Sequence, residues 1–434
     1  MPVIAIFMCA KIVRKVLNNK INRSAGVIIF KFGQSLSRIL KTHQVKNKFL
    51  LLVPYSYPDY SGSGRNAFNF GKFLVKRGVP VRLVTFNRSL KYKKREQIDG
   101  LNIIRIRYLN QNLFLKMISL FWILPVYFFR ICTSDIIYIY GANLIAWQSV
   151  ILFAKICGKK IIFRSLIFGE DDIFSLTSVR SKLNRDFHRY LIKLADCYFS
   201  IHPAFSKEYL EVIGNTTPLL EVPQGVDTEN FHPVSPEEKK DIRKKLGLPE
   251  NDFIIVSIAF LIDRKGFDGI FNQLSYFNHS FQYLIIGEYN FNEGHFLSNR
   301  QGEALRLRKK GTDLLGSKFQ LLGPKENINE YIQASDVSLF NSHAEGVPNS
   351  MLEAMACGIP IISNPIKGLE GYLLHHQENS LIFSQLTELN NTIEVLYNDP
   401  DLRRSIGFKA HETVGKNGTF DIVLKIILNK MDIE

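Results

Sequence analysis

Short apolar runs alternate with longer stretches of helical periodicity from residue 49 to the C-terminus. The first run is followed by a glycine-containing loop and a helical stretch near Gly64–Arg77. Strands that are apolar along most of their length are typical of a parallel sheet covered by helices on both faces. In the first half of the chain the predicted strands are Phe49–Pro54, Val81–Thr85, Leu101–Arg107, Ile136–Tyr140, Lys160–Arg164 and Cys197–Ile201.

The alternation pauses at Gly214–Pro218 and then resumes. Ser235 is a predicted helix cap, with Pro236 in the first turn and Glu238 completing a capping box. The strands predicted in this second half are Phe253–Phe260, Tyr283–Gly287, Phe319–Leu322, Val337–Phe340 and Pro360–Ser363. The pattern therefore predicts an α/β protein with two Rossmann-like lobes, residues 49–214 and 219–413. In such sheets, ligands bind beyond the carboxyl ends of the strands, here in a cleft between the lobes.

The formal net charge of +15 is concentrated at the N-terminus. Residues 1–48 contain ten Lys or Arg and no acidic side chain, which leaves 45 basic and 40 acidic side chains in the rest of the 434-residue chain. A basic extension on a nearly neutral body argues against a nucleic-acid-binding protein. Residues 6–21 have an amphipathic pattern that fits a membrane surface, a solvated extension or a helix packed on its own domain.

The other compartment signals indicate a cytosolic protein. The five cysteines are scattered without a CxxC pair, so we expect reduced, buried thiols. A secretory signal is not expected, because the apolar run Val3–Ala10 precedes the basic residues. No segment is predicted to reach the ~18–20 apolar residues that span a bilayer. The longest run, Met117–Phe129, lies between Lys116 and Arg130 and fits either a core helix or a surface facing lipid.

Two loops carry weak signals for a phosphate site. In one, Gly62 and Gly64 lie between a strand and a helix, where glycine lets the backbone approach a ligand and the helix N-terminus favours an anion. In the other, Arg264 and Lys265 follow a predicted strand, and two adjacent cations there could hold a diphosphate. Each loop taken alone is equally well explained as an ordinary surface turn.

The segment Glu345–Pro360 carries the most specific signal. Glu345 lies in a loop, and Glu353 lies about one turn into a helix that begins near Asn349. Glu353 could accept hydrogen bonds from two vicinal ribose hydroxyls. The free N–H groups of the first helical turn could bind phosphate oxygens. The residues of that turn are Asn349, Ser350, Met351 and Leu352.

Three segments together resemble the retaining GT-B glycosyltransferases of family 4, the glycosyl transferases group 1. The run from Glu345 to Glu353 is similar to the family's E-x7-E motif in the setting E-G-x-P-N-x-x-L-E-A-M-A-C-G-x-P. Val222–Asp227 with Phe231–Pro233 resembles the linker P-N-G-V-D…F-x-P, with Gln224 in place of Asn. Leu261–Gly266 resembles part of R-L-x-x-x-K-G. The likeness begins near residue 49 and is most specific over residues 222–383.

The resemblance implies the GT-B fold and transfer of a sugar from a UDP- or GDP-sugar to a hydroxyl of a lipid-linked or saccharide acceptor. Such a reaction belongs to surface polysaccharide or glycolipid synthesis at the cytosolic face of the membrane. It also implies a last helix, within residues 414–434, that packs back on the first lobe. No metal or other cofactor is expected, and the nucleotide sugar is a substrate.

The resemblance also implies roles for particular residues. Glu345 would lie at the donor sugar and Lys265 at the diphosphate, as catalytic residues, and Glu353 would hold the ribose. The further donor contacts it implies are Arg264, Gly62, Gly64, Gly346, Asn349, Ser350, Met351 and Leu352.

Three departures from the family pattern bear on function. Phe260 stands where the family has an arginine, and our hypothesis is that Arg264 supplies the missing charge. Arg164 and Ser165 occupy the region where the family often has a first-lobe histidine. The family's double glycine is reduced to Lys367-Gly368. Two alternatives therefore stay open: a non-catalytic GT-B partner that binds a sugar nucleotide, and a sugar-nucleotide epimerase.

Overall fold

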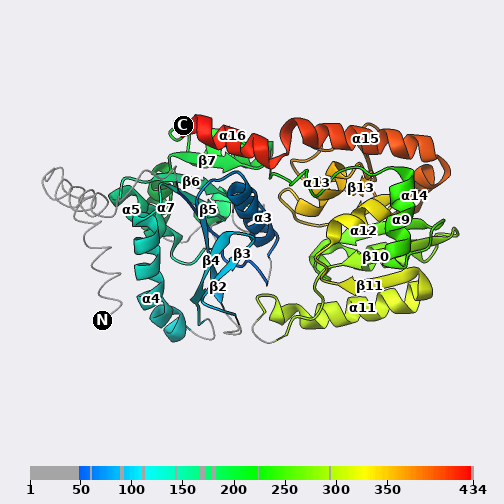
Figure 1. Ribbon diagram of the computed structural model, residues 1–434, viewed down its shortest axis with the longest axis horizontal. Coiled ribbons are helices and arrows are strands. Elements are labelled where there is room, and N and C mark those ends of the chain that lie inside the picture. The colour runs from blue at the N-terminus through cyan, green and yellow to red at the C-terminus, as the bar shows by residue number, and fades with distance from the viewer. Residues whose placement is uncertain are drawn as a thin grey trace, which may run out of the picture.

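The computed structural model describes residues 48–431 except 59–60, 88–91, 110–112, 142–143, 167–171, 178–181, 223 and 293–294. The amphipathic segment 6–21 and nearly all of the basic extension lie outside the described residues. Figure 1 shows two lobes side by side, each built around one sheet. The predicted α/β fold of two Rossmann-like lobes is therefore confirmed.

The first lobe contains an eight-stranded sheet in which all paired strands are parallel except β3, which runs antiparallel to β4. In sheet order its strands are β3 (Arg95–Ile98), β4 (Leu101–Arg107), β2 (Val81–Asn87), β1 (Phe49–Leu52), β5 (Ile136–Tyr140), β6 (Lys160–Arg164), β7 (Cys197–Ser200) and β8 (Leu219–Glu221). Its helices are α3 (Gly62–Lys76), α4 (Leu113–Cys132), α5 (Trp147–Ile156), α6 (Ile173–Thr177), α7 (Lys182–Lys193) and α8 (Pro203–Val212).

Alternate residues of β1 enter two different hydrophobic clusters, as the strand period of two requires. Leu50 and Leu52 pack with residues of α4, α5 and α7. Phe49 and Leu51 pack with residues of α3 and α16 (Phe420–Lys430). The sheet is therefore buried on both faces, which explains why its strands are apolar along most of their length.

The second lobe contains a six-stranded parallel sheet. In sheet order its strands are β11 (Phe319–Gly323), β10 (Phe281–Ile286), β9 (Phe253–Ile258), β12 (Val337–Phe340), β13 (Ile361–Ser363) and β14 (Ser380–Ile382). Its α-helices are α9 (Pro236–Leu246), α10 (Phe267–Leu274), α11 (Gln301–Leu315), α12 (Ile328–Ala334), α13 (Asn349–Ala356), α14 (Leu389–Asn398) and α15 (Pro400–Asn417). Short 3-10 turns lie at η1 (Asp263–Lys265), η2 (Ser298–Arg300), η3 (Gly316–Lys318) and η4 (Leu386–Glu388). The predicted capping box at Ser235 is present at the start of α9.

The predicted lobe boundaries need two corrections. Residues 219–221 form β8, which pairs with β7, so the first lobe extends past the pause at Gly214–Pro218. At the other end, α15 continues through residue 414 and ends at Asn417 in the second lobe. The chain returns to the first lobe at Gly418–Thr419, and Phe420 and Ile427 of α16 enter the core of that lobe. Packing of the last helix on the first lobe is as predicted.

Helix α4 is longer than the apolar run that predicted it. It includes the apolar residues beyond Lys116 and Arg130, so Phe114–Cys132 is a 19-residue segment with a mean hydropathy of 1.6. The prediction that no segment reaches this length was wrong, because charged side chains at two positions do not interrupt a helix. Ile123 and Tyr127 on one side of α4 are buried in the core, whereas its other side is exposed.

Candidate functional site

The centre of the candidate site is an ion pair between Lys265 and Glu345. Strands β9 and β12 are parallel neighbours, so the loops that follow them leave the same edge of the sheet. Lys265 ends the turn after β9, and its Nζ donates a hydrogen bond to Oε1 of Glu345 in the loop after β12. Nη1 of Arg264 lies 3.6 Å from the same carboxylate oxygen and donates to the carbonyl of Ala344. The fold thus brings together residues that two separate motifs had singled out.

The Glu345 carboxyl stays ionised at neutral pH. Burial acts to raise its pKa, but the charges of Lys265 and Arg264, with a hydrogen bond from Ser342, outweigh burial and hold the pKa below its usual value. Two cations then face one anion, which leaves an excess positive charge at the ends of β9 and β12. A site of this kind favours an anionic ligand.

A hollow opens beside this charge cluster. It is lined by Ser257 and Ala259 at the end of β9, by Lys265, and by Asn341 and Ser342 after β12. Ligands of open α/β sheets bind at this position, outside the carboxyl ends of the strands.

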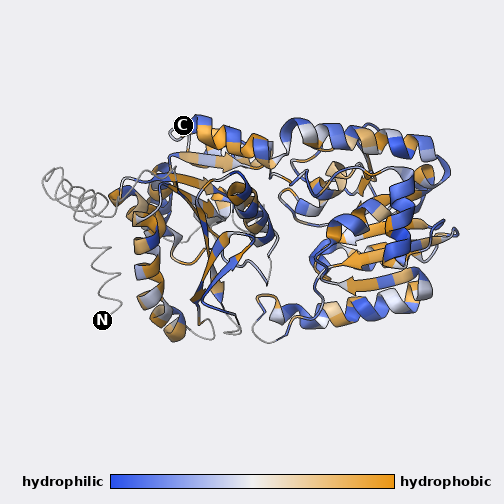
Figure 2. Cartoon of the chain, viewed as in Figure 1, coloured by the Kyte–Doolittle hydropathy of each residue, from blue (hydrophilic) through white to orange (hydrophobic). Residues whose placement is uncertain are grey.

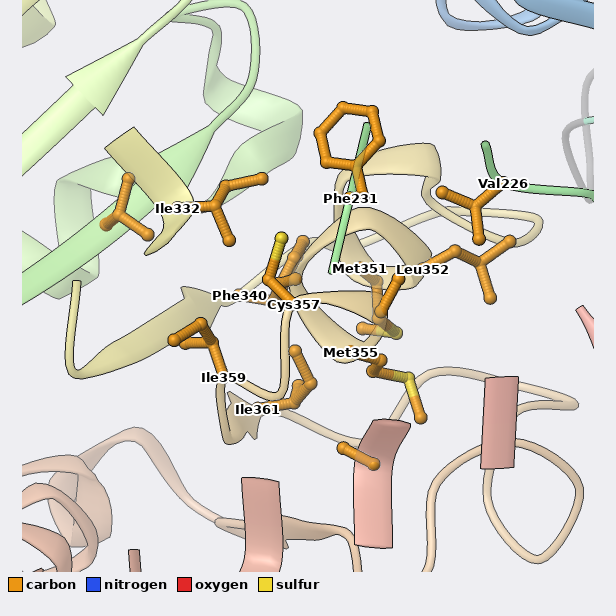
Figure 3. Close-up of a cluster of buried hydrophobic side chains, with 14 of the residues drawn as sticks. Val226, Phe231, Ile332, Phe340, Met351, Leu352, Met355, Cys357, Ile359 and Ile361 are labelled. Carbon is orange, nitrogen blue, oxygen red and sulfur yellow. The ribbon is translucent and has the colours of Figure 1, made fainter. Parts of the chain in front are cut away.

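Helix α13 supplies the second carboxylate and part of the lobe's core. Glu353 is only 4% exposed, and burial raises its pKa, partly opposed by Arg65 of the first lobe, whose Nε lies 3.8 Å away. Met351 and Leu352 are fully buried among hydrophobic side chains, as Figure 3 shows for the cluster around α13. Their N–H groups donate to the carbonyl of Pro348. The prediction that these two residues offer free N–H groups was therefore wrong, and Asn349 and Ser350 remain the candidates for donating to phosphate.

Helix α3 presents its N-terminus to α13 from the opposite lobe. The Gly62 carbonyl accepts a hydrogen bond of 2.6 Å from Nδ2 of Asn349. The N–H of Gly64 donates to the capping oxygen of Ser61, so this N–H is already used at the start of the helix. Gly64 also has a packing role, because a Cβ there would lie 1.6 Å from the carbonyl oxygen of Tyr55.

Further contacts join the lobes around this site. Nδ2 of Asn66 donates to the carbonyl of Gly225 at 3.0 Å and lies 3.3 Å from Oδ1 of Asn349. Nε2 of Gln224 donates to the carbonyl of Val347. Gly346 fits closely against the first lobe, because a Cβ there would lie 2.1 Å from the carbonyl oxygen of Leu166.

Phe260, which replaces the family arginine, belongs to an aromatic cluster that crosses the cleft. Its ring packs edge-on against Phe296 and Phe291, with centroid separations of 5.7 and 6.1 Å. Phe296 in turn stacks on Tyr55 of the first lobe, with the centroids 4.8 Å apart and the planes at 6°. The second lobe therefore meets the first through aromatic rings next to the predicted phosphate loops.

Arg65, Asn66 and the Tyr55–Phe296 stack were not predicted as parts of the site. Each contacts a partner in the other lobe, at a sequence separation of 283 for Asn66 and Asn349. Arg65 and Tyr55 lie in or beside the glycine loop, and this position in the sequence could have marked them as site residues.

Comparison with known proteins identifies the second lobe. Residues 238–413 match the family model "Glycosyl transferases group 1", which confirms the predicted resemblance for this part of the chain. The UDP-Gal:alpha-D-GlcNAc-diphosphoundecaprenol alpha-1,3-galactosyltransferase of Escherichia coli is 29% identical over 223 residues, covering 48% of this chain and 54% of the relative. A GDP-mannose-dependent monoacylated alpha-(1-6)-phosphatidylinositol monomannoside mannosyltransferase of Corynebacterium glutamicum is 25% identical over 258 residues, covering 57% and 61%. The chain thus spans little more than half the length of these relatives.

Solved structures match nearly the whole described fold. Alr3699/HepE of Anabaena, solved with UDP and glucose, superimposes with a TM-score of 0.68 at 17% identity, covering 89% of this chain and 99% of that one. Sucrose-phosphate synthase of Thermosynechococcus elongatus superimposes with a TM-score of 0.70 at 17% identity and the same coverage. At this identity the likeness shows the fold, which is GT-B.

Proposed function

Residues 238–413 form a domain of the glycosyl transferases group 1 family, and from this premise we propose that the protein transfers a sugar from a UDP- or GDP-sugar to a hydroxyl group. The Lys265–Glu345 ion pair with Arg264 beside it is the observation that carries the proposal. It lies at the strand ends where α/β sheets bind nucleotides, and its excess positive charge suits a diphosphate.

Each residue of the site has a part in this reaction. Lys265 and Arg264 stabilise the negative charge that develops on the diphosphate as its bond to the anomeric carbon breaks. Asn349 and Ser350 present the N-terminus of α13 to the same phosphates. Glu345 orients the donor sugar by accepting hydrogen bonds from its hydroxyls, and Glu353 accepts hydrogen bonds from the ribose.

The proposed chemistry is a retaining, front-face displacement. The acceptor oxygen forms a bond to the anomeric carbon on the face from which the nucleoside diphosphate departs. The acceptor's proton passes to a diphosphate oxygen, which leaves the nucleoside diphosphate and the glycosylated acceptor as products. Contacts of the lobes at Gly346 and Gly62 support a closed cleft that keeps water from the anomeric carbon.

The proposed acceptor is a saccharide or a lipid-linked saccharide in surface polysaccharide or glycolipid synthesis. Two relatives act on lipid-linked substrates by their names, an undecaprenol diphosphate and a phosphatidylinositol mannoside. We propose that the protein works in the cytoplasm at the inner face of the membrane, with the ten cations of residues 1–48 contacting anionic lipid.

The test is a donor screen by nucleotide release. The full-length protein is incubated with a panel of UDP- and GDP-sugars and a membrane lipid extract, and release of UDP or GDP is measured. We expect release with one donor class and its loss, by about 1,000-fold or more, in Glu345→Ala. Glu326→Ala, an exposed carboxylate of the same lobe, is the control and should retain release.

The two alternatives make different predictions in the same experiment. A non-catalytic partner would show a rise in melting temperature with the nucleotide sugar but no release of nucleotide with any donor and acceptor. An epimerase would convert the sugar without an acceptor.

A further inference from the structure

Helix α4 carries an apolar face that the described part of the protein leaves uncovered. Ser119, Ile123, Tyr127 and Ile131 recur every four residues and are buried against the first lobe. On the outer side three phenylalanines are exposed, Phe114 by 71%, Phe121 by 57% and Phe129 by 63%. Figure 2 shows predominantly hydrophobic colour along this helix. Contiguous exposed apolar surface of this kind marks an interaction site.

The helix is fixed to the lobe along its length. Among the described residues, Phe114–Cys132 is the one helical segment long and apolar enough to cross a membrane, yet it is joined to the end of β4. Nε1 of Trp122 donates to the carbonyl of Arg107 at 2.6 Å, and the N–H of Leu109 donates to Oγ of Ser119 at 2.9 Å. A crossing helix would have to leave the sheet and expose its buried side, so the helix presents its outer face along the protein surface.

Cations lie near both ends of α4. Lys116 and Arg107 are exposed near the first turns of the helix. Near the other end, Nη1 of Arg82 donates to Oγ1 of Thr133. Burial lowers the pKa of Arg130, and the neighbouring charges of Arg82 and Arg95 lower it further. Mutual repulsion within this cluster would be relieved by an anionic partner.

We propose that the outer face of α4 docks on a lipid bilayer with anionic headgroups. The three phenylalanines enter the interfacial region, and the flanking cations bind lipid phosphates. Charge complementarity favours this partner over the two others available. A second copy of the protein would bring two positively charged clusters together. Residues 1–48 carry ten cations and no acidic side chain, so they would be repelled by the same cluster.

The docked orientation follows from the sheet topology. Strands β1, β2 and β4 are parallel, so the loop after β1, which leads to α3, and the segment after β4, which leads to α4, leave the same edge. Docking of α4 along its length therefore turns the sheet face opposite α3 toward the lipid, with the first turn of the helix at this edge. The docking itself does not depend on the proposed function. Its benefit does rest on that function, because docking would let a lipid-linked acceptor reach the cleft without leaving the leaflet.

The experiment is vesicle flotation with the full-length protein. The vesicles contain phosphatidylcholine alone or phosphatidylcholine with phosphatidylglycerol, and no substrate is needed, so the result is independent of the proposed activity. The test variant carries F114Q, F121Q and F129Q, because Gln is a good helix former and the three side chains are exposed. The control is F408Q, which removes a phenylalanine that is 59% exposed on α15 of the second lobe.

We expect the triple variant to melt like the parent protein and to bind phosphatidylglycerol vesicles about 100-fold more weakly. F408Q should bind like the parent. R95Q with R130Q should weaken binding to anionic vesicles and reduce its dependence on salt. Unchanged vesicle binding in the triple variant would overturn the proposal. A parent dimer that becomes a monomer in the triple variant, with vesicle binding unaffected, would instead show that the face joins two copies.

Discussion

Glu208 is a buried carboxyl of the first lobe whose pKa lies above its usual value. It lies on α8, is 9% exposed and accepts a hydrogen bond from the N–H of Phe174. Burial raises its pKa from 4.5 to about 7, although the Phe174 N–H opposes the shift, and the neighbouring Asp172 carboxyl contributes to it. The folded protein therefore favours the protonated acid. This contribution to stability is complete below about pH 4.5 and is lost as the pH rises through about 7.

Replacement of Glu208 by Gln keeps an acceptor oxygen and removes the ionisation. We expect the free energy of unfolding of Glu208→Gln to match that of the parent near pH 4.5 and to exceed it by about 2–3 kcal/mol at pH 8. Urea unfolding at both pH values measures the difference. Glu211→Gln, at an exposed position of the same helix, is the control and should leave the pH dependence unchanged. A parent-like pH dependence in the Glu208 variant would contradict the assignment.

The candidate chemistry could be predicted from the sequence where a residue type and a motif coincide. The motifs in the sequence predict Glu345, Lys265 and Arg264 as site residues, and the three lie together in the structure. The contact of Glu353 with Arg65 could not be predicted, because the two residues belong to different lobes and meet only when these are packed together. Met351 and Leu352 were misassigned because a motif position does not reveal whether an N–H is already used within the helix.

At the scale of elements, burial determines what the sequence reveals. Strands covered on both faces, such as Ile136–Tyr140, have an apolar pattern that predicts them with the observed bounds. The missed strands β3, β8 and β14 have only three or four residues, and β3 has the polar sequence R-E-Q-I at the edge of its sheet. Runs of three or four residues are too short to show a strand pattern of their own. The pause at Gly214–Pro218 therefore precedes a strand instead of ending the lobe.

The start of α3 depends on the absence of a side chain at Gly64. A Cβ at Gly64 would lie 1.6 Å from the Tyr55 carbonyl oxygen, so Gly64→Ala must move backbone that also carries the Tyr55–Phe296 stack. We expect a loss of about 2 kcal/mol or more in the free energy of unfolding, measured by urea denaturation. Gly62→Ala is the matched control, because its nearest neighbour would be Nδ2 of Asn349 at 4.0 Å. Equal stability of the two variants would show that the helix start can shift freely.

At the scale of the whole molecule, the two chain crossings between the lobes lie side by side. The N–H of Val226 donates to the carbonyl of Gly418, and the N–H of Phe420 donates to the carbonyl of Val226. A movement of one lobe against the other must therefore bend both crossings together. The contacts farther out, at Gly346 and Gly62, are the ones that such a movement would make and break.

Gly346 tests whether these outer contacts hold the lobes in the arrangement seen in Figure 1. A Cβ on Gly346 would lie 2.1 Å from the Leu166 carbonyl oxygen and 2.6 Å from Cδ1 of Ile201, both in the first lobe. We expect Gly346→Ala to hold the lobes apart, which increases the radius of gyration in small-angle X-ray scattering. Affinity for the nucleotide sugar should fall about tenfold, or ~1.4 kcal/mol. Gly302→Ala, with nothing within 4 Å of the added carbon, controls for the substitution itself. If Gly346→Ala keeps the parent's radius and affinity, the cleft closes without this contact, and water exclusion must depend on the aromatic stack of Tyr55 and Phe296 instead.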